Sequence, residues 1–275
     1  MGNKYTGKTF ILEILTLVLG ILFLIPFYYV IANSFKTFAD ILTKTSEFPK
    51  VFEWSNYTDA FERMQYWKVF GNSLLITIIS NVIIIIFCSM AAYMLVRTKR
   101  KISNIIFFMF VAAMVIPFQS IMIPLVKAAG QFHLLNSIWG IVIMYLGFGS
   151  GISIFLYHGF IKGIPVELEE AAIIDGCSTF GVFWRIVFPL LKPITVTIMI
   201  LNSLWIWNDF LLPSLVLQDT NLRTIPLAMY FFFGQYTKQW NLALAALVIS
   251  IIPLLIFFFA MQKHIIKGIT SGSIK

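Results

Sequence analysis

One segment between two long apolar runs decides how this chain is organised: KGIPVELEEAAIIDGCSTFGVFWRIVFPLLKP, residues 162–193. Its residue pattern predicts two short helices. Pro165 suits the first helical position, and the three glutamates that follow fall in the first turns, where the helix dipole favours acidic groups. Gly176 suits the left-handed residue that ends a helix, and Ser178 can cap the next one.

The first of these helices is too short to be stable by itself, because an isolated helix of about ten residues is marginal in water. Its apolar residues give it a surface that must be covered: Val166, Ala171, Ala172, Ile173 and Ile174. This surface can pack back onto the same chain, or it can insert into a groove of another protein. The residue pattern favours neither alternative.

Outside this segment the chain is dominated by apolar runs that are long enough to cross a hydrocarbon layer of about 30 Å. There are six, at residues 10–32, 69–96, 102–126, 137–160, 194–212 and 241–262. Hydrophobic residues make up 59% of the chain and charged residues 12%, against about 25% charged in soluble domains. We therefore expect an all-α, multi-pass integral membrane protein with six transmembrane helices, in which Pro117 and Pro124 kink the third.

The basic residues predict an orientation for these helices. Short loops rich in Lys and Arg stay in the cytoplasm, and RTKRK at residues 97–101 is the strongest example. Placing both termini inside puts most of the 20 basic residues on the cytoplasmic side. We therefore predict an N-in, C-in topology, with residues 162–193 as the longest cytoplasmic segment.

If the chain drives transport of a solute, its sequence offers no obvious source of energy. Residues 2–9, GNKYTGKT, match the phosphate-binding pattern G-x-x-x-x-G-K-T, but a transmembrane helix follows where a soluble helix would be needed. No acid or base falls in the middle of a predicted helix, where a proton- or sodium-coupled carrier normally has one. We predict a protein that is not an enzyme and has no catalytic, metal or nucleotide site, so any energy must come through a partner.

The stretch EAAIIDG at residues 170–176, followed by Ile186 and Pro189, resembles the EAA signature of bacterial ABC-importer permeases. The family pattern is E-A-A-x-x-x-G, nine residues, then I-x-L-P, and Phe188 stands here in place of the leucine. The resemblance implies the type I ABC-importer fold, with this loop seated in a cleft of a separate cytoplasmic ATPase that binds the ATP. The coupling residues that it implies are Glu170, Ala171, Ala172, Asp175 and Gly176.

Further segments are similar to carbohydrate importers of the maltose-permease type, and to their smaller six-helix subunit. They are NSFKT (33–37), FGNSLLIT (70–77), WNDFLLP (207–213) and KHIIKGITSGSIK (263–275). This similarity implies a sugar importer in the bacterial plasma membrane, with a homologous second permease, an ATPase dimer and an extracellular binding protein. It also implies that the tail contacts the ATPase through Lys267, Gly268, Thr270 and Gly272, whereas a solvated basic tail is the alternative.

The predicted organisation has three parts: residues 1–68 (tail, first helix and outer loop), 69–262 (permease core) and 263–275 (cytoplasmic tail). Sugars are bound by neutral hydrogen-bonding groups and aromatic faces. Candidates for lining the substrate path are therefore Asn81, Asn202, Trp205 and Asn208, although these residues could equally well only tie helices together.

Two other functions stay open from the sequence. One keeps the ABC architecture but changes the cargo to glycerol phosphate or another small solute, and the other is a self-sufficient carrier or channel. An anionic cargo would favour basic residues along the path, and none falls in mid-membrane.

Overall fold

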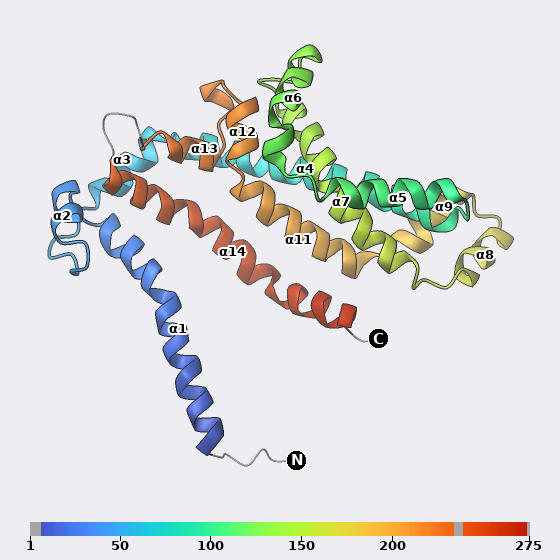
Figure 1. Ribbon diagram of the computed structural model, residues 1–275, viewed down its shortest axis with the longest axis horizontal. Helices are drawn as coiled ribbons and strands as arrows, with labels where there is room; N and C mark the ends of the chain where they lie inside the picture. Colours follow the sequence, from blue (N-terminus) through green and yellow to red (C-terminus); the bar gives the residue numbers. More distant parts are fainter. Residues whose placement is uncertain (1–6, 234–238, 274–275) are drawn as a thin grey trace. The chain divides into compact units, whose positions relative to one another are not determined.

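Helices form nearly all of the regular structure in the computed structural model, which describes residues 7–233 and 239–273 (Figure 1). The longer helices are α1 (Gly7–Ser34), α4 (Tyr66–Arg97), α5 (Lys101–Ala113), α6 (Phe118–Gln131), α7 (Ile138–Ile161), α11 (Lys192–Asn208) and α14 (Trp240–Ser273). The shorter helices are α2 (Phe38–Thr43), α3 (Ser55–Arg63), α8 (Glu167–Ile174), α9 (Thr179–Val182), α10 (Phe188–Leu190), α12 (Leu211–Val216) and α13 (Ile225–Tyr230), with the π-helical turn η1 (Phe183–Val187) and the 3₁₀ turn η2 (Thr220–Leu222).

Four helical stretches of the described chain are each long and apolar enough to cross a membrane: Thr9–Ser34, Tyr66–Arg97, Ile138–Ile161 and Trp240–Gln262. Two bent helix pairs supply two more spans if each pair is counted as one. The count then reaches the six spans that the sequence predicts.

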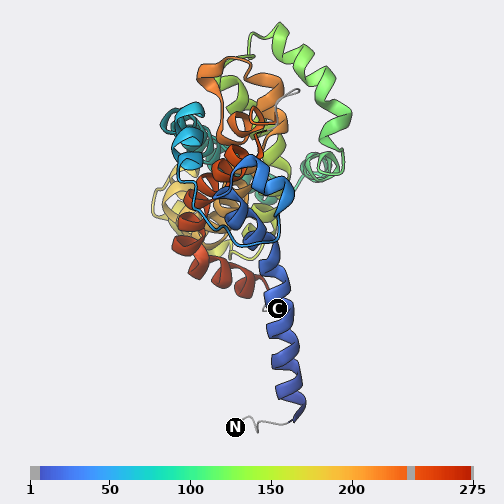
Figure 2. The same cartoon turned by 90° about the vertical axis from the view of Figure 1, so that its left-hand side faces the viewer.

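The third apolar run differs from the expected kinked helix. It forms two helices, α5 and α6, that meet at 105° across a break at residues 114–117, visible as the green elbow in Figure 2. The cause is Pro117, which disfavours helical geometry in the residue before it and has no N–H to continue the ladder. Pro124 lies inside α6, so only the first of the two prolines breaks the run.

The fifth apolar run ends earlier than the sequence suggests. Helix α11 stops at Asn208, and Asp209 then has an extended backbone with φ −71° and ψ 126°. The Asp209 Oδ1 atom accepts a hydrogen bond of 3.0 Å from the Leu211 amide, at the start of α12. The aspartate therefore ends one helix and begins the next, which explains why the run does not continue to residue 212.

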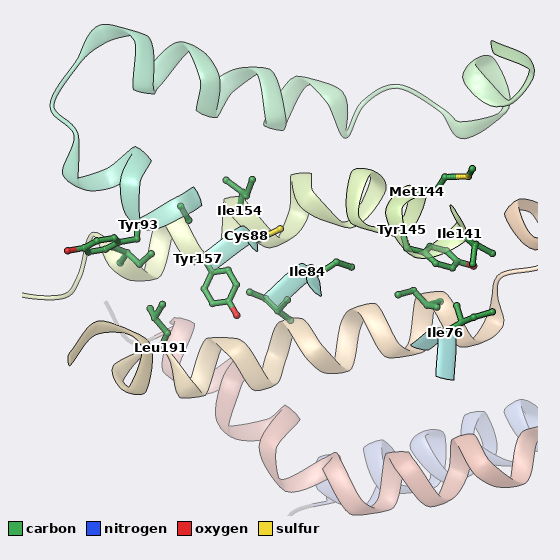
Figure 3. Packing of buried hydrophobic residues seen from close by; sticks show 14 of the residues in the cluster. Ile76, Ile84, Cys88, Tyr93, Ile141, Met144, Tyr145, Ile154, Tyr157 and Leu191 are labelled. Carbon is green, nitrogen blue, oxygen red and sulfur yellow. The ribbon is translucent and has the colours of Figure 1, made fainter. Parts of the chain in front are cut away.

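The chain divides into two compact units. One comprises Trp67–Leu227 and Leu254–Lys275, and its core lies between α4, α7 and α11, where Figure 3 shows Ile84, Tyr145 and Tyr157. A side chain at Gly149 of α7 would come within 2.7 Å of Ile84 Cδ1. Small residues allow this close approach of helices, as is common in membrane bundles.

The other unit comprises Met1–Tyr66 and Ala228–Pro253. Here the segment after α1 is held by buried polar groups. The Asn56 side-chain amide donates to the carbonyls of Ser34 and Lys36, at 2.9 Å each, and its Oδ1 accepts from Asn241 at 2.7 Å. Polar side chains therefore fix the fold of this loop.

Candidate functional site

The short helix α8 ends in a well-formed Schellman motif. Gly176 has φ +85°, and its amide donates to the Ile173 carbonyl at 3.0 Å, while the Cys177 amide donates to the Ala172 carbonyl at 2.9 Å. The Ser178 hydroxyl then accepts a 3.2 Å bond from the Gly181 amide and caps α9. These are the end signals that the sequence predicts for Gly176 and Ser178.

The start of α8 differs by two residues from the prediction. Pro165 precedes the helix, which begins at Glu167 with Val166 at the N-cap. All three glutamates still lie in the first turn, where the amide dipoles favour them.

Helix α8 is covered on one side and open on the other. Glu169 and Ala172 are buried, whereas Glu170, Ala171 and Asp175 are exposed. The exposed side also carries apolar residues, of which Ile174 is 85% exposed. Within the described chain, one face of α8 therefore packs back on the same chain, which is the first alternative, while the other face has no cover.

An ion pair within the unit that contains Trp67–Leu227 holds the covered face of α8 against the end of α4 (Figure 1). Arg97, the last residue of α4, points two guanidinium nitrogens at Glu169 Oε1: Nε at 2.8 Å and Nη2 at 2.6 Å. The other carboxylate oxygen accepts the Tyr93 hydroxyl at 2.8 Å. Arg97 Nη2 also donates to the Ile164 carbonyl at 3.1 Å, so the arginine binds α8 and the loop before it together.

The connection from α9 to α11 contains the π-helical turn η1. The Phe188 amide bonds to the Phe183 carbonyl, five residues back. Pro189 explains the wider turn, because in a regular helix its ring would clash with the carbonyl four residues before it. The chain then bends by 75° into α11, with Phe183 packed against Tyr93 at a ring distance of 5.3 Å.

The four candidate path residues fall into two groups. Asn81 and Asn202 are both buried. Asn81 Nδ2 donates to Thr77 O at 2.9 Å and to Ser203 Oγ at 3.2 Å. Asn202 Nδ2 donates to Ser153 Oγ at 3.2 Å. Each links its own helix to a neighbouring one. In the structure as described, these two residues tie helices together and offer little surface to a solute.

Trp205 and Asn208 lie on the open face of α11, both exposed. The Trp205 ring stands edge-on to Tyr145, with ring centroids 5.4 Å apart and an interplanar angle of 81°. The Tyr145 hydroxyl in turn donates to Asp209 Oδ2 at 3.0 Å. The tryptophan is thus an exposed aromatic surface on a rigid, hydrogen-bonded support.

The remaining candidates are the tail residues Lys267, Gly268, Thr270 and Gly272. The backbone of α14 runs through them to Ser273, but their side chains lie outside the described residues.

Sequence reasoning missed the cluster of Glu169, Arg97 and Tyr93 that holds α8 to the end of α4. Glu169 and Ala172 are three residues apart and therefore lie on one face of the helix. This spacing could have indicated which face of α8 is covered. Nothing local pointed to Arg97 as the partner, because it lies 72 residues earlier in the chain.

Comparison with known structures supports the fold. The chain aligns over 95% of its length, and 99% of the other chain, with a chain in the crystal structure of a bacterial ABC transporter involved in the import of the acidic polysaccharide alginate. The TM-score is 0.78 and the sequence identity 24%. This similarity shows that the two chains share a type I permease architecture.

Curated relatives match over nearly the whole chain. The chain is 50% identical to the probable starch degradation products transport system permease protein AmyC of Thermoanaerobacterium thermosulfurigenes, covering 99% of each protein. It is 38% identical to the multiple sugar-binding transport system permease protein MsmG of Streptococcus mutans, covering 93% of each. It is 36% identical to the melibiose/raffinose/stachyose import permease protein MelC of Bacillus subtilis, covering 100% of each.

The model of a protein family described as the binding-protein-dependent transport system inner membrane component matches residues 84–271, a range that contains α8 and the whole of α11. With full-length relatives and a shared fold, the chain belongs to this family of ABC-transporter permeases, which are multi-pass proteins of the bacterial plasma membrane and not enzymes.

Proposed function

We propose that this chain is one of two membrane-spanning subunits of an ATP-driven importer for neutral oligosaccharides or related polyols. A separate ATPase binds the ATP, an extracellular binding protein delivers the sugar, and a homologous permease forms the other half of the path. The observation that carries the proposal is the uncovered apolar and acidic face of α8. The names of the full-length relatives, which are sugar permeases, support it.

The coupling role rests on the exposed residues of α8 and its end. Glu170, Ala171, Asp175 and Gly176 form a surface that a groove of the ATPase can receive, as an amphipathic helix docks in a groove. Ala172 contributes differently, because it is buried against its own chain and so holds the surface in place. The tail from Lys267 to Gly272 supplies a second contact with the ATPase.

The substrate path rests on α11. Trp205 offers an aromatic face on which a sugar ring can stack, and Asn208 offers neutral hydrogen-bonding groups. Neither residue carries a charge, which suits a neutral sugar better than glycerol phosphate or another anion. Asn81 and Asn202 support this path by fixing α4 and α7 against α11.

The experiment that tests this function begins with affinity purification of the tagged chain in mild detergent. The expected result is recovery of an ATPase and a second permease with its own EAA loop. The recovered complex is then placed in liposomes with ATP inside and the binding protein outside, and uptake of maltotriose, raffinose and an arabino-oligosaccharide is measured.

Glycerol phosphate serves as the anionic control in the same assay. ATP-dependent uptake of a neutral sugar and exclusion of glycerol phosphate would support the proposal. Solute uptake by the purified chain alone, without ATP or partners, would replace it with a self-sufficient carrier.

A further inference from the structure

The cluster of Arg97, Glu169 and Tyr93 has no part in the exposed surface of α8, yet it joins three separate parts of the chain. It links the end of α4, the loop at Ile164 and the first turn of α8. The Tyr93 ring extends the connection to Phe183 in η1. One cluster, in which Glu169 and Tyr93 are buried, therefore connects α4, the loop at Ile164, α8 and η1.

Glu169 is 5% exposed, and both oxygens of its carboxylate accept hydrogen bonds. Burying two charges is expensive, and an apolar contact of similar volume is often as stable as a buried ion pair. Two guanidinium nitrogens on one carboxylate oxygen and the Tyr93 hydroxyl on the other do, however, fix the direction of the carboxylate more tightly than apolar packing. The cluster is thus better suited to holding α8 in one orientation than to adding stability.

The orientation matters because α8 has only eight residues and cannot hold itself in place. Glu169 and Glu170 are neighbours, and the helix turns them to different sides: Glu169 toward Arg97, Glu170 outward. Glu169 is therefore the polar anchor that decides which face of α8 stays open.

We propose that Arg97 and Glu169 are positioning residues that fasten α8 to the end of α4, so that a displacement of α8 moves α4 as one body. The inference rests on the proposed function, since the displacement is the one that a docked ATPase would impose. From α4 the connection continues through Asn81 to Ser203 on α11, the helix that carries Trp205. The open face of α8 and the candidate path are thereby joined through α4, with side-chain bonds at each end.

Two variants test the fastening, and an exposed glutamate on another helix provides a control with the same chemical change. Glu169→Gln keeps the shape and removes the charge, whereas Arg97→Lys keeps the charge and removes the fork. Glu62→Gln makes the same chemical change as Glu169→Gln at an exposed position in α3, outside the proposed docking surface. All three are made in the full importer complex with its ATPase, second permease and binding protein.

The first measurement is amide hydrogen exchange of α8 in the purified complex without nucleotide. Glu169→Gln should speed the exchange about ten-fold, and Arg97→Lys less, because local opening becomes easier when the anchor is lost. The control should leave the exchange unchanged. Unchanged exchange in both test variants would overturn the proposal.

The second measurement is the number of sugar molecules taken up per ATP hydrolysed, in liposomes, with the sugar that the wild-type complex accumulates best from the panel above. Glu169→Gln should lower this ratio about ten-fold, a coupling change of the size that mutations between two sites produce, with ATP hydrolysis and complex assembly retained. Arg97→Lys should fall between Glu169→Gln and wild type. If either test variant loses uptake, hydrolysis and assembly in equal proportion, the pair is only structural and the proposal fails.

Different results would contradict the proposed function and the proposed positioning role of Arg97 and Glu169. A wild-type complex that hydrolyses ATP but imports no sugar on the panel would count against the proposed function, while the exchange experiment still decides whether Glu169 fastens α8. A wild-type complex that imports sugar, with a normal ratio in both test variants, would overturn the positioning role alone.

Discussion

Gly176 has a backbone geometry that few residue types can adopt. Its φ of +85° costs an ordinary L-residue about 1–2 kcal/mol, and asparagine less. A side chain there would meet no neighbouring atom, so the strain comes from the backbone alone. We expect Gly176→Val to lower sugar uptake strongly at normal membrane abundance, and Gly176→Asn to keep most of it.

The same position allows a test of charge. Gly176→Asp differs from Gly176→Asn in one group, and it places a negative charge beside Asp175 on the open face of α8. Uptake should be lost with Asp and retained with Asn, measured at matched expression. Normal uptake by Gly176→Asp would show that this end of α8 contacts no partner.

Lys36 is a second residue whose contacts predict the effect of a substitution. It is 4% exposed, and its ammonium donates to Asn33 Oδ1 at 3.0 Å, to the Lys44 carbonyl at 2.7 Å and to the Thr45 carbonyl at 3.3 Å. Lys36→Met fills the space but removes the donor to the buried Asn33 Oδ1 and to the Lys44 carbonyl, whereas the Thr45 carbonyl keeps a bond of 3.1 Å from Asn33 Nδ2. A buried polar group left without a partner costs about 1–3 kcal/mol.

We expect Lys36→Met to lower the thermal midpoint of the detergent-solubilised complex by several degrees. Lys50→Met, at an exposed position in the same segment, is the control and should leave the midpoint unchanged. Equal midpoints for both variants would show that the ammonium contributes nothing to the stability of the loop.

At the level of elements, one face of α11 packs against a neighbouring helix and the other is exposed. Asn202, 2% exposed, bonds to Ser153 across the helix interface, whereas Trp205, 41% exposed, presents its ring. Asn202→Ala should lower thermal stability by about 0.6 kcal/mol, the average for such bonds between membrane helices, with an unchanged KM for uptake.

Trp205→Ala should act on transport instead. Removing a stacking ring should raise the KM for sugar uptake about ten-fold, in line with the 0.5–1.5 kcal/mol of an aromatic contact. A raised KM for Asn202→Ala and a normal one for Trp205→Ala would reverse the assignment of the two faces.

Helix α8 shows how far sequence reasoning reaches. Its acidic first turn, its glycine end and the serine cap that follows are local features, so the pattern predicts them. The choice of covered face depends on Arg97, which local pattern cannot connect to Glu169 across 72 positions. For the same reason, the sequence suggests both Asn81 and Trp205 for the path but cannot say which of them is buried.

The elbow between α5 and α6 shows a different limit. Two prolines in one apolar run predict two kinks, but only Pro117 breaks the run, and the angle of 105° is far larger than a kink. Apolar length predicts that a segment belongs in the membrane, whereas its path there depends on tertiary contacts. A count of apolar runs therefore gives six spans, which the described chain reaches if each bent pair is counted as one, and it gives the wrong shape for the third.

At the scale of the whole molecule, the apolar surface of a single copy is large. Helix α1 is exposed along nearly all of its apolar length, which suits contact with lipid or with a second membrane subunit. In the described part of the chain, the open faces of α8 and α11 are two further surfaces without cover. Such surfaces suit a subunit of a larger assembly.

The orientation of the molecule in the membrane is the remaining prediction, and exposed positions make it testable. In a chain whose Cys88 and Cys177 are replaced by serine, single cysteines are introduced by Glu47→Cys, Lys99→Cys and Ile174→Cys, all at exposed sites. The basic loop at Lys99 should lie in the cytoplasm, and α8 should lie on the same side.

A membrane-impermeant maleimide should therefore label Glu47→Cys in intact cells, and the other two only after the membrane is opened. Ile174→Cys should in addition react more slowly when the ATPase is co-expressed, while Lys99→Cys should not change. Labelling of Ile174→Cys in intact cells would place α8 outside, where an ATPase cannot reach it, and both the topology and the coupling role would then be wrong.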